Sequence, residues 1–469
     1  MAAYRARTRE MVGNPMARNG AACQSYGFSR ITVAAVMREN LLCEPHAAPY
    51  RVSCIMGAPN HNARNSVAAG REATGRATGA RSPSLFVVAG EASGDWAGAL
   101  LAEALRRKRP EIRLRGVGGW RMSEAGVDLA ADSSDWGAIG VADALRKIPG
   151  VYREVQRLKS RLAEERPSGL VLIDAGAVNV RLARMVQDYG LKILYYLPPG
   201  SWSRKPRSQA MRDLVDVIAT PYPWSRDLLS GGRARVEWVG HPVLETARPK
   251  LSAEQAWERY GLDRRRPVVA LAPGSRSQEM RYVLPVMARA AALLAKRSAG
   301  TQFLLPLSNP AYENQVRQAL RRVGVEATLL QGMEYDALQL AGAAAVCSGT
   351  ATLEFACLGL PMVVVYKASP GTTIQFLLVR GVIGKQWRAA MPNIIAGRDV
   401  VPELLWKHAK PEAVARELSS LLEDRERRQQ MQRDLAEVVR NLGEPGASDR
   451  TADLVLEMIG VGDDSGGAV

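Results

Sequence analysis

Short apolar runs alternate with longer amphipathic segments along this chain from residue 85 onward. Runs of three to five mainly apolar residues occur at 85–89, 170–173, 193–197, 217–219, 267–271, 302–306, 327–330, 343–347 and 362–366. Runs of this length predict strands buried on both faces of parallel sheets. The segments between them predict helices that begin near residue 94, in the 140s and near residue 178.

Strands that alternate with helices indicate an α/β fold of doubly wound parallel sheets. The chain has 469 residues, more than one core usually contains, so we expect two Rossmann-like domains that face each other across a cleft. We place the first over 83–246 and the second over 247–425. Residues 1–82 lack periodicity and are expected to be a disordered extension, and 426–469 a C-terminal helix and disordered tail. The charged helices expected over 411–442 are predicted to pack back across the first domain.

Charge adds a preference for anionic partners. The net charge is +16, and the first 82 residues hold eleven Arg, four Glu and neither Lys nor Asp. The remaining chain is moderately basic, which suits a phosphorylated substrate, an anionic lipid surface or nucleic acid, or serves solubility alone. No zinc-finger or RNA-recognition pattern supports nucleic acid. No apolar run approaches the roughly 20 residues of a membrane span, so we expect a cytoplasmic protein.

The five cysteines have no metal-ligand spacing, and the body of the chain has no Asp-x-Asp motif. We therefore expect no metal site and no cofactor.

The segment from Gly90 to Asp95 follows the apolar run 85–89 and leads into a helical pattern. Its small residues allow a ligand to approach the backbone, and Glu91, Ser93 and Asp95 add polar groups. The pattern predicts a binding turn. It equally fits a helix capped by Ser93 or Asp95.

Asp174 lies at the end of the run 170–173. Open α/β sheets carry their chemistry at the carboxyl ends of strands, so Asp174 is a candidate general base that takes a proton from a hydroxyl. The alternative is the N-cap of the helix expected near residue 178.

Two turns in the second half are candidate phosphate sites. In the first, Gly274 and Ser275 offer N–H groups and Arg276 a bidentate charge, against the alternative of an ordinary loop arginine. The second runs from Ser348 through Gly349 and Thr350 to Glu354. It predicts a diphosphate cradle at a helix N-terminus, with Glu354 able to bind ribose hydroxyls, or a capping box.

Two further features of the chain each fit a structural and a functional role. His241 lies in the turn Gly240-His241-Pro242, where a structural hydrogen bond at a domain hinge is favoured over catalysis. Residues 139–162 form a basic amphipathic pattern, which fits a helix that rests on an anionic membrane surface or lines an apolar substrate channel. An ordinary surface helix explains the pattern equally well.

Taken in register, these motifs resemble the lipid A disaccharide synthase family of GT-B glycosyltransferases. The resemblance runs from about residue 85 to about 421. It also rests on Gly116-Val117-Gly118-Gly119, Val239 to Pro242, Glu279, Pro392 to Arg398 and Val401 to Leu405.

This resemblance implies an inverting transfer of 2,3-diacylglucosamine from UDP to 2,3-diacylglucosamine 1-phosphate. Asp174 would then be the base, and Arg276 would bind the donor diphosphate. The acceptor residues would be Glu91, Ser93 and Asp95. The donor residues would be Gly274, Ser275, Ser348, Gly349, Thr350, Glu354 and Asn393. Acylated substrates imply a peripheral position at the inner membrane, and an oligomer is compatible with the pattern.

Three segments of the first half differ from the family pattern. The family reads Asp-Ala-Pro-Asp-Phe-Asn where this chain has residues 174–179 as Asp-Ala-Gly-Ala-Val-Asn, and residues 133–139 and 200–205 also differ. The alternatives are a related enzyme with a different acceptor, an isomerase resembling UDP-N-acetylglucosamine 2-epimerase, and a non-catalytic relative.

Overall fold

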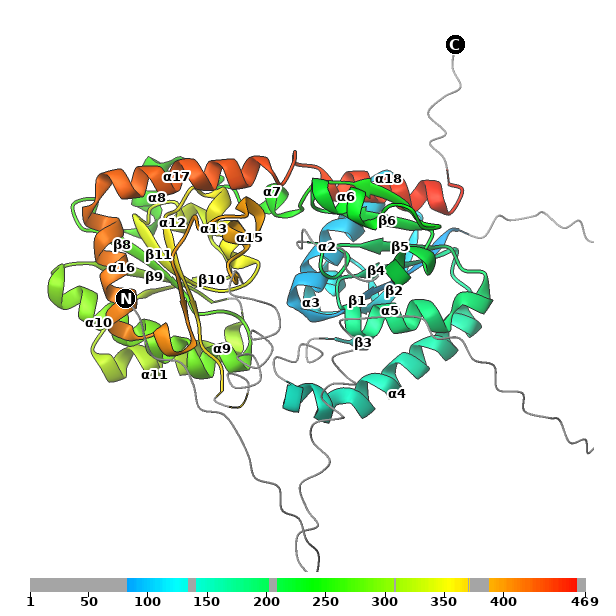
Figure 1. Ribbon diagram of the computed structural model, residues 1–469, viewed down its shortest axis with the longest axis horizontal. Coiled ribbons are helices and arrows are strands. Elements are labelled where there is room, and N and C mark those ends of the chain that lie inside the picture. The colour runs from blue at the N-terminus through cyan, green and yellow to red at the C-terminus, as the bar shows by residue number, and fades with distance from the viewer. Residues whose placement is uncertain are drawn as a thin grey trace, which may run out of the picture. The chain divides into compact units, whose positions relative to one another are not determined.

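The computed structural model describes residues 82–133, 141–201, 209–307, 309–369, 371 and 388–461. These residues contain two parallel sheets with helices between the strands (Figure 1). The extension expected over residues 1–82 and the end of the expected tail, residues 462–469, fall outside this description apart from residue 82.

The first sheet has seven parallel strands in the order β3-β2-β1-β4-β5-β6-β7. The strands are β1 (Ser84–Ala89), β2 (Arg113–Gly118), β3 (Asp128–Asp132), β4 (Gly169–Ile173), β5 (Ile193–Tyr196), β6 (Val217–Thr220) and β7 (Arg235–Trp238). The helices between them are α2 (Glu91–Lys108), α3 (Trp120–Glu124), α4 (Val141–Glu165), α5 (Gly176–Met185) and α6 (Pro223–Leu229), with short 3-10 turns η1 (Gln187–Tyr189) and η2 (Gln209–Asp213).

The second sheet has six parallel strands in the order β10-β9-β8-β11-β12-β13. They are β8 (Val268–Ala272), β9 (Gln302–Leu307), β10 (Thr328–Gln331), β11 (Ala343–Cys347), β12 (Met362–Tyr366) and β13 (Glu403–Leu405). Its helices are α8 (Ala253–Tyr260), α9 (Ser277–Tyr282), α10 (Leu284–Arg297), α11 (Glu313–Val323), α12 (Tyr335–Leu338), α13 (Ala351–Cys357), α15 (Met391–Ala396), α16 (Pro411–Glu423) and α17 (Arg425–Arg440), with η3 (Pro310–Tyr312) and η4 (Trp406–His408). Helix α7 (Val243–Thr246) lies in the chain between the two sheets.

Strand β1 shows why the central strands are apolar throughout. Leu85, Val87 and Ala89 belong to one buried cluster, and Phe86 and Val88 to another. Successive strand residues point to opposite faces, so a strand covered on both faces carries apolar residues at every position. The sequence patterns of β4, β8, β11 and β12 have the same cause.

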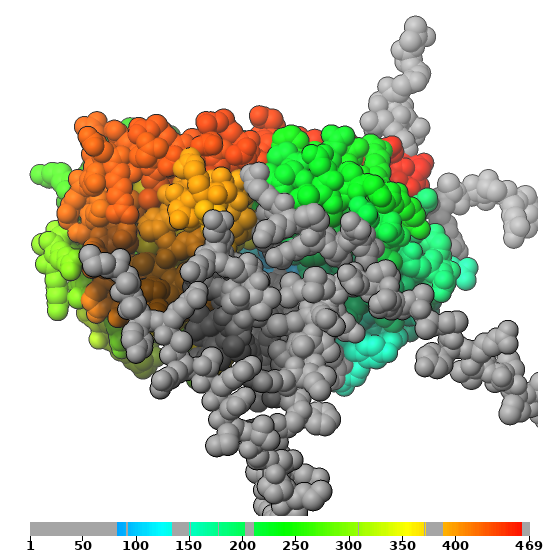
Figure 2. Space-filling view, in the orientation of Figure 1, coloured from blue at the N-terminus to red at the C-terminus, as the bar shows by residue number. Residues whose placement is uncertain are grey.

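The C-terminal helices pack differently from the sequence-based expectation. Helices α16 and α17 bury Leu418 and Leu435 in the core of the second sheet, not against the first. They form part of the surface shown in orange in Figure 2. The helix that returns to the first sheet is α18 (Ala447–Met458), which the sequence analysis placed in a disordered tail. Its Val455 lies in the core beside β1, because the chain crosses back after residue 442.

The sequence pattern does not predict four of the strands, β2, β3, β7 and β13. In β2, Arg113 and Arg115 are exposed and alternate with buried residues, so no apolar run appears. Strand β3 is half-buried at the sheet edge, and β13 has only three residues. An edge strand has one neighbour and a less apolar pattern, and this removes the signal on which the prediction rests.

Candidate active site

All four predicted turns lie at the points where strand order reverses. In the first sheet the reversal is between β1 and β4, and in the second between β8 and β11. Ligands of open α/β sheets bind outside the carboxyl ends of the strands at such points. The segment Gly90–Asp95 follows β1 and Asp174 follows β4, while Gly274 follows β8 and Ser348 follows β11. The shared strand order therefore brings distant motifs together in each sheet.

A cavity of about 740 Å³ is lined by residues of both domains. From the first domain it is lined by Ala92, Ser93, Asp95, Trp96, Gly119, Trp120, Arg121 and Ser133. The second domain contributes the predicted residues Gly274, Ser275, Arg276, Ser348, Gly349, Thr350 and Glu354. Asp174 is outside this lining but accepts a hydrogen bond of 3.0 Å from Ser93 Oγ. The predicted base thus lies one side chain away from the cavity wall.

Asp174 has an unusual backbone conformation. Its φ is +50°, and the φ of Ala175 is +44°, although neither residue is glycine. Left-handed backbone at such residues costs about 1–3 kcal/mol each and persists where the surroundings enforce it. Helix α5 has Ala175 as its N-cap, without a capping side chain. Asp174 is therefore not the N-cap, which was the alternative to catalysis.

Two buried side chains hold the backbone of Asp174. Tyr195 Oη donates to the Asp174 carbonyl oxygen at 2.6 Å, and Asn179 Nδ2 donates to the same oxygen at 3.1 Å. Asn179 also donates to the Ile173 carbonyl at 3.0 Å. Burial, followed by the charge of Asp174, raises the pKa of Tyr195 well above its ordinary value, so the phenol remains a donor. These contacts compensate for the strained turn.

Asp95 has a structural task within the predicted acceptor half. Its buried carboxylate accepts from Gly119 N at 2.6 Å, Met122 N at 3.1 Å and Arg121 N at 3.2 Å. It thereby holds the start of α3 against α2. The N-cap of α2 is Gly90, without a capping side chain, so neither Ser93 nor Asp95 caps that helix. Glu91 is the first residue of α2, and its side chain lies outside the described part of the chain.

The turn after β8 differs from the prediction in its use of backbone N–H groups. The buried Glu279 carboxylate accepts from Ser275 N at 2.8 Å and from Arg276 N at 3.1 Å. The N–H groups of Ser275 and Arg276 therefore already donate to Glu279 and are not directed at a phosphate. Arg276 Nη1 also lies 3.4 Å from Glu279 Oε1, and its half-exposed side chain lines the cavity. In the sequence, Glu279 stands out only through the family resemblance, and the spacing Arg-x-x-Glu of a capping box is the signal for its role.

The turn after β11 presents free backbone donors. The N–H groups of Gly349, Thr350 and Ala351 donate to no other residue in the described ranges. Gly349 has a φ of +152°, and a methyl group at its Cα would meet no atom within 4 Å. Ser348 Oγ donates to the Ala389 carbonyl at 2.9 Å, which anchors the turn. The arrangement can accept an anion at the beginning of α13.

Glu354 faces the same cavity from the first turn of α13. It accepts from Tyr335 Oη at 2.7 Å, and α13 has no capping side chain, so the capping-box alternative is not realised. Burial raises the pKa of Glu354, while Tyr335 and Arg121 act in the opposite direction. Arg121 comes from the first domain and lines the cavity with Glu354. In the sequence, Arg121 belongs only to the family resemblance and has no assigned role, since only the fold brings it near α13.

Asn393 does not line the cavity. Its buried amide accepts from Val400 N at 2.7 Å and Val401 N at 2.9 Å, and donates to Glu403 Oε1 at 2.9 Å. Glu403 in turn accepts from Ala389 N at 3.0 Å. Asn393 thus supports the segment that anchors Ser348, and its place among the donor-binding residues stays a prediction.

His241 has the structural role that the sequence analysis favoured. The ring Nδ1 accepts from Val243 N at 3.1 Å, and the backbone N–H of His241 donates to the Leu442 carbonyl at 2.9 Å. Burial lowers the pKa of His241 to about 3, so the ring is neutral near pH 7. It connects the chain after β7 with the chain after α17.

The basic amphipathic pattern at 139–162 falls largely within α4. Val155, Leu158 and Leu162 are buried in the core of the first domain, as an ordinary surface helix requires. Residues 139 and 140 and the side chains of 141–149 and 151 lie outside the described part, as do the altered residues 134–139 and 202–205. Among the described residues, no helix is long and apolar enough to cross a membrane, and no group of three metal-ligating side chains occurs.

Two Rossmann-like domains with a shared cavity define the GT-B architecture. Solved structures of similar fold include a UDP-GlcNAc 2-epimerase from Neisseria meningitidis bound to UDP-GlcNAc, with a TM-score of 0.53 and 13% identity over 80% of this chain and all of that one. The S. aureus MnaA–UDP co-structure has a TM-score of 0.55 and 12% identity over 82% of this chain and all of that one. At such identities the likeness shows the fold alone.

Sequence comparison defines the family. Residues 85–458 match the model described as lipid-A-disaccharide synthetase. The lipid-A-disaccharide synthases of Syntrophus aciditrophicus and Geobacter sulfurreducens are 37% and 36% identical over 379 and 381 residues, which span 80% of this chain and 97% of each relative. The chain belongs to the lipid-A-disaccharide synthetase family and is a glycosyltransferase. The resemblance seen in the motifs is confirmed.

Proposed function

We propose that this enzyme transfers 2,3-diacylglucosamine from UDP to 2,3-diacylglucosamine 1-phosphate, which gives a disaccharide 1-phosphate and UDP. The observation that carries this proposal is the cavity that joins Ser93, the partner of Asp174, to Arg276 and the turn at Ser348–Thr350. An inverting transfer needs a base beside the acceptor hydroxyl and positive groups beside the leaving diphosphate. The two switch points supply one each.

In the acceptor half, Asp174 takes the proton of the attacking hydroxyl. Ser93 Oγ donates to Asp174 Oδ2 and so helps to orient the carboxylate that receives that proton. Tyr195 and Asn179 both donate to the backbone carbonyl oxygen of Asp174 and so fix the direction of its carboxylate. Asp95 supports this wall through the start of α3, and Glu91 and Ser93 complete the proposed acceptor side.

In the donor half, negative charge grows on the departing UDP. Arg276 lines the cavity and offers a charge-assisted contact with the diphosphate. The N–H groups of Gly349, Thr350 and Ala351 add partial positive charge at the start of α13. Glu354, held by Tyr335 at 2.7 Å, is placed to bind a ribose hydroxyl.

Substrates with acyl chains partition into lipid, so we place the enzyme at the cytoplasmic surface of the inner membrane as a peripheral protein. The basic balance of the chain is consistent with an anionic lipid surface. The proposed reaction requires neither a metal nor a cofactor.

The direct test supplies radiolabelled UDP-diacylglucosamine with and without the monosaccharide 1-phosphate and separates the lipid products. A labelled disaccharide phosphate that forms only in the presence of both substrates is the expected result. UDP release with a different acylated acceptor would instead indicate an altered acceptor, which the change to Gly176 and Ala177 after Asp174 makes the relevant second candidate. Epimerisation of UDP-N-acetylglucosamine, or UDP binding without any transfer, would contradict the proposal.

A further inference from the structure

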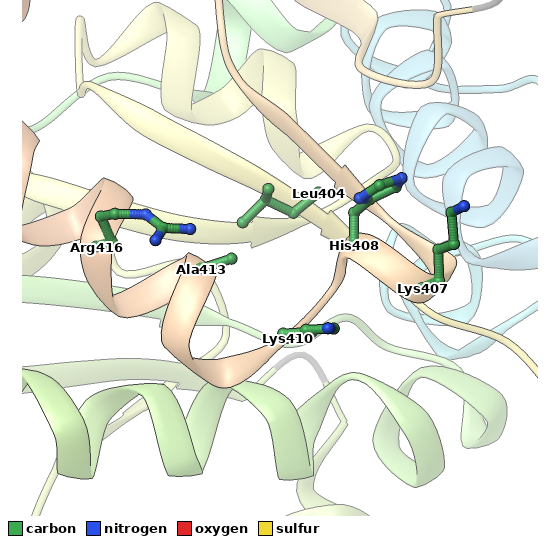
Figure 3. A pocket seen from close by; sticks show the side chains of 6 residues that line it. All are labelled: Leu404, Lys407, His408, Lys410, Ala413 and Arg416. Atoms are coloured by element: carbon green, nitrogen blue, oxygen red, sulfur yellow. The ribbon is translucent and has the colours of Figure 1, made fainter.

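A second cavity, of about 500 Å³, lies in the second domain outside the lining of the proposed active site. It is lined by Leu404, Lys407, His408, Lys410, Ala413 and Arg416. Figure 3 shows Arg416 and His408 on the two sides of Leu404, with Lys407 beyond His408 and Lys410 below Leu404. Four of the six lining side chains carry nitrogen donors, and none is acidic.

These four polar side chains have no ion pair or hydrogen bond with any other described residue. The three acids on the same helix do not neutralise them. Glu417 pairs with Arg427 at 2.5 Å, Glu423 accepts from Ser419 Oγ at 2.7 Å, and Glu412 is exposed without lining the cavity. Like charges gathered without counter-ions repel one another and favour the binding of an anion.

The segment that carries Lys407 and His408 is anchored on both sides. Trp406 and Ala409 are buried, and Ala409 N donates to the Trp406 carbonyl at 3.2 Å. Lys410 is the N-cap residue of α16, a helix of 13 residues whose first turn lies beside the cavity. The positive end of this helix adds to the side-chain charges. The cations thus come from a fixed turn and not from a freely moving loop.

We propose that this cavity binds the phosphate group of an organic phosphate ester. Lys407, Lys410 and Arg416 contact the phosphate oxygens and His408 donates a further hydrogen bond, while Leu404 and Ala413 form an apolar floor for the organic part. Arg and Lys are the side chains that bind phosphate by bidentate and point-charge contacts. The site goes beyond the proposed transfer reaction and uses none of its residues. A soluble phosphate ester and a lipid headgroup share this chemistry.

The test measures hydrogen exchange of the backbone amides in residues 404–416 with three separate probes: inorganic phosphate, soluble dihexanoyl phosphatidic acid, and vesicles of phosphatidylglycerol with phosphatidylcholine. Vesicles of phosphatidylcholine alone are the uncharged-surface control. We expect protection of this segment by at least one anionic probe. Protection by phosphate and the soluble ester alone indicates a soluble ligand, and protection by the vesicles indicates a headgroup.

The variant Lys407→Gln/Lys410→Gln/Arg416→Gln should lower affinity at this segment by about tenfold or more, since each charge-assisted contact contributes on that order. The matched control is Lys250→Gln/Lys296→Gln/Arg321→Gln, which removes the same charges from exposed positions of the same domain. It should retain protection at 404–416. Absence of protection by every anionic probe, or equal loss in the control, would overturn the proposal. UDP binding at the first cavity should persist in both variants, so this test is independent of the proposed transfer.

Discussion

The two sheets have the same strand order but build their switch-point turns by different means. In the first domain, Asp174 and Ala175 adopt left-handed backbone without glycine, and buried Tyr195 and Asn179 hold them. In the second domain, glycines occupy the positions with positive φ, which is +110° at Gly274 and +152° at Gly349.

This difference reflects what each turn has to present. The base proposed for the first turn is a carboxylate side chain, and backbone strain at Asp174 is the cost of holding it there. The diphosphate site proposed for the second domain uses backbone N–H groups and a cation, and residues without a Cβ let such a ligand approach the chain. Under the proposed function, one scaffold would support proton removal in one domain and charge stabilisation in the other.

The strongest test of this contrast is Asp174→Asn, because Asn adopts left-handed backbone readily and keeps the shape of the turn. We expect the rate of sugar transfer to fall on the order of 10²–10⁴-fold, since the base is lost, with UDP affinity unchanged. Turnover and UDP binding are measured in parallel. Near-normal turnover would remove Asp174 from the mechanism.

Arg276→Ala examines the donor side. We expect UDP to bind roughly tenfold to a hundredfold more weakly, because a charge-assisted contact is lost. Titration calorimetry with UDP measures the change. Arg281→Ala is the control, since Arg281 is an exposed cation of the same helix, α9, that does not line the cavity. Equal affinity in the Arg276 variant and the wild type would exclude the diphosphate contact.

Gly274→Ala and Gly349→Ala separate stability from binding within the donor turns. A methyl group at Gly274 would overlap the Glu279 carboxylate, whereas one at Gly349 meets no atom within 4 Å. We expect the Gly274 variant to melt at a lower temperature than the Gly349 variant, by roughly 2–4 °C for each kcal/mol of added cost. The Gly349 variant should instead lose UDP affinity. Equal melting temperatures would show that Glu279 moves aside freely.

His241 belongs to neither turn and should affect stability without affecting transfer. Its folded pKa of about 3 lies below the ordinary value near 6.5, so the unfolded chain binds a proton first as the pH falls. Stability is fully present above pH 6.5 and should decrease by about 1 kcal/mol between pH 6.5 and 5.5. Urea unfolding of the wild type and of His241→Gln at both pH values measures this pH-dependent part of the free energy of unfolding. The variant should lack it, and an identical pH dependence would contradict the assignment.

The local sequence pattern was sufficient to predict a strand wherever burial on both faces of the sheet made that strand wholly apolar. The central strands β1, β4, β8 and β11 were predicted for that reason, and with them the turns that carry Asp174, Arg276 and Ser348. The edge strands β3, β7 and β13 were not, because an edge position leaves polar residues in the pattern. The inner strand β2 was not predicted either, because the exposed Arg113 and Arg115 interrupt its apolar run. Helix α18 was also missed, since its amphipathic face is explained only by a sheet more than 200 residues earlier in the chain.

The amino-acid sequence by itself determined the alternation of strands and helices, the order of the motifs and the family. Only the tertiary structure decided which polar groups meet: Asp95 with the start of α3, Glu279 with the N–H groups of the Gly274 turn, and Arg121 with Glu354 in one cavity. Strand and turn propensities depend on neighbours in the chain, whereas these contacts depend on strand order and on which faces of the sheets are covered.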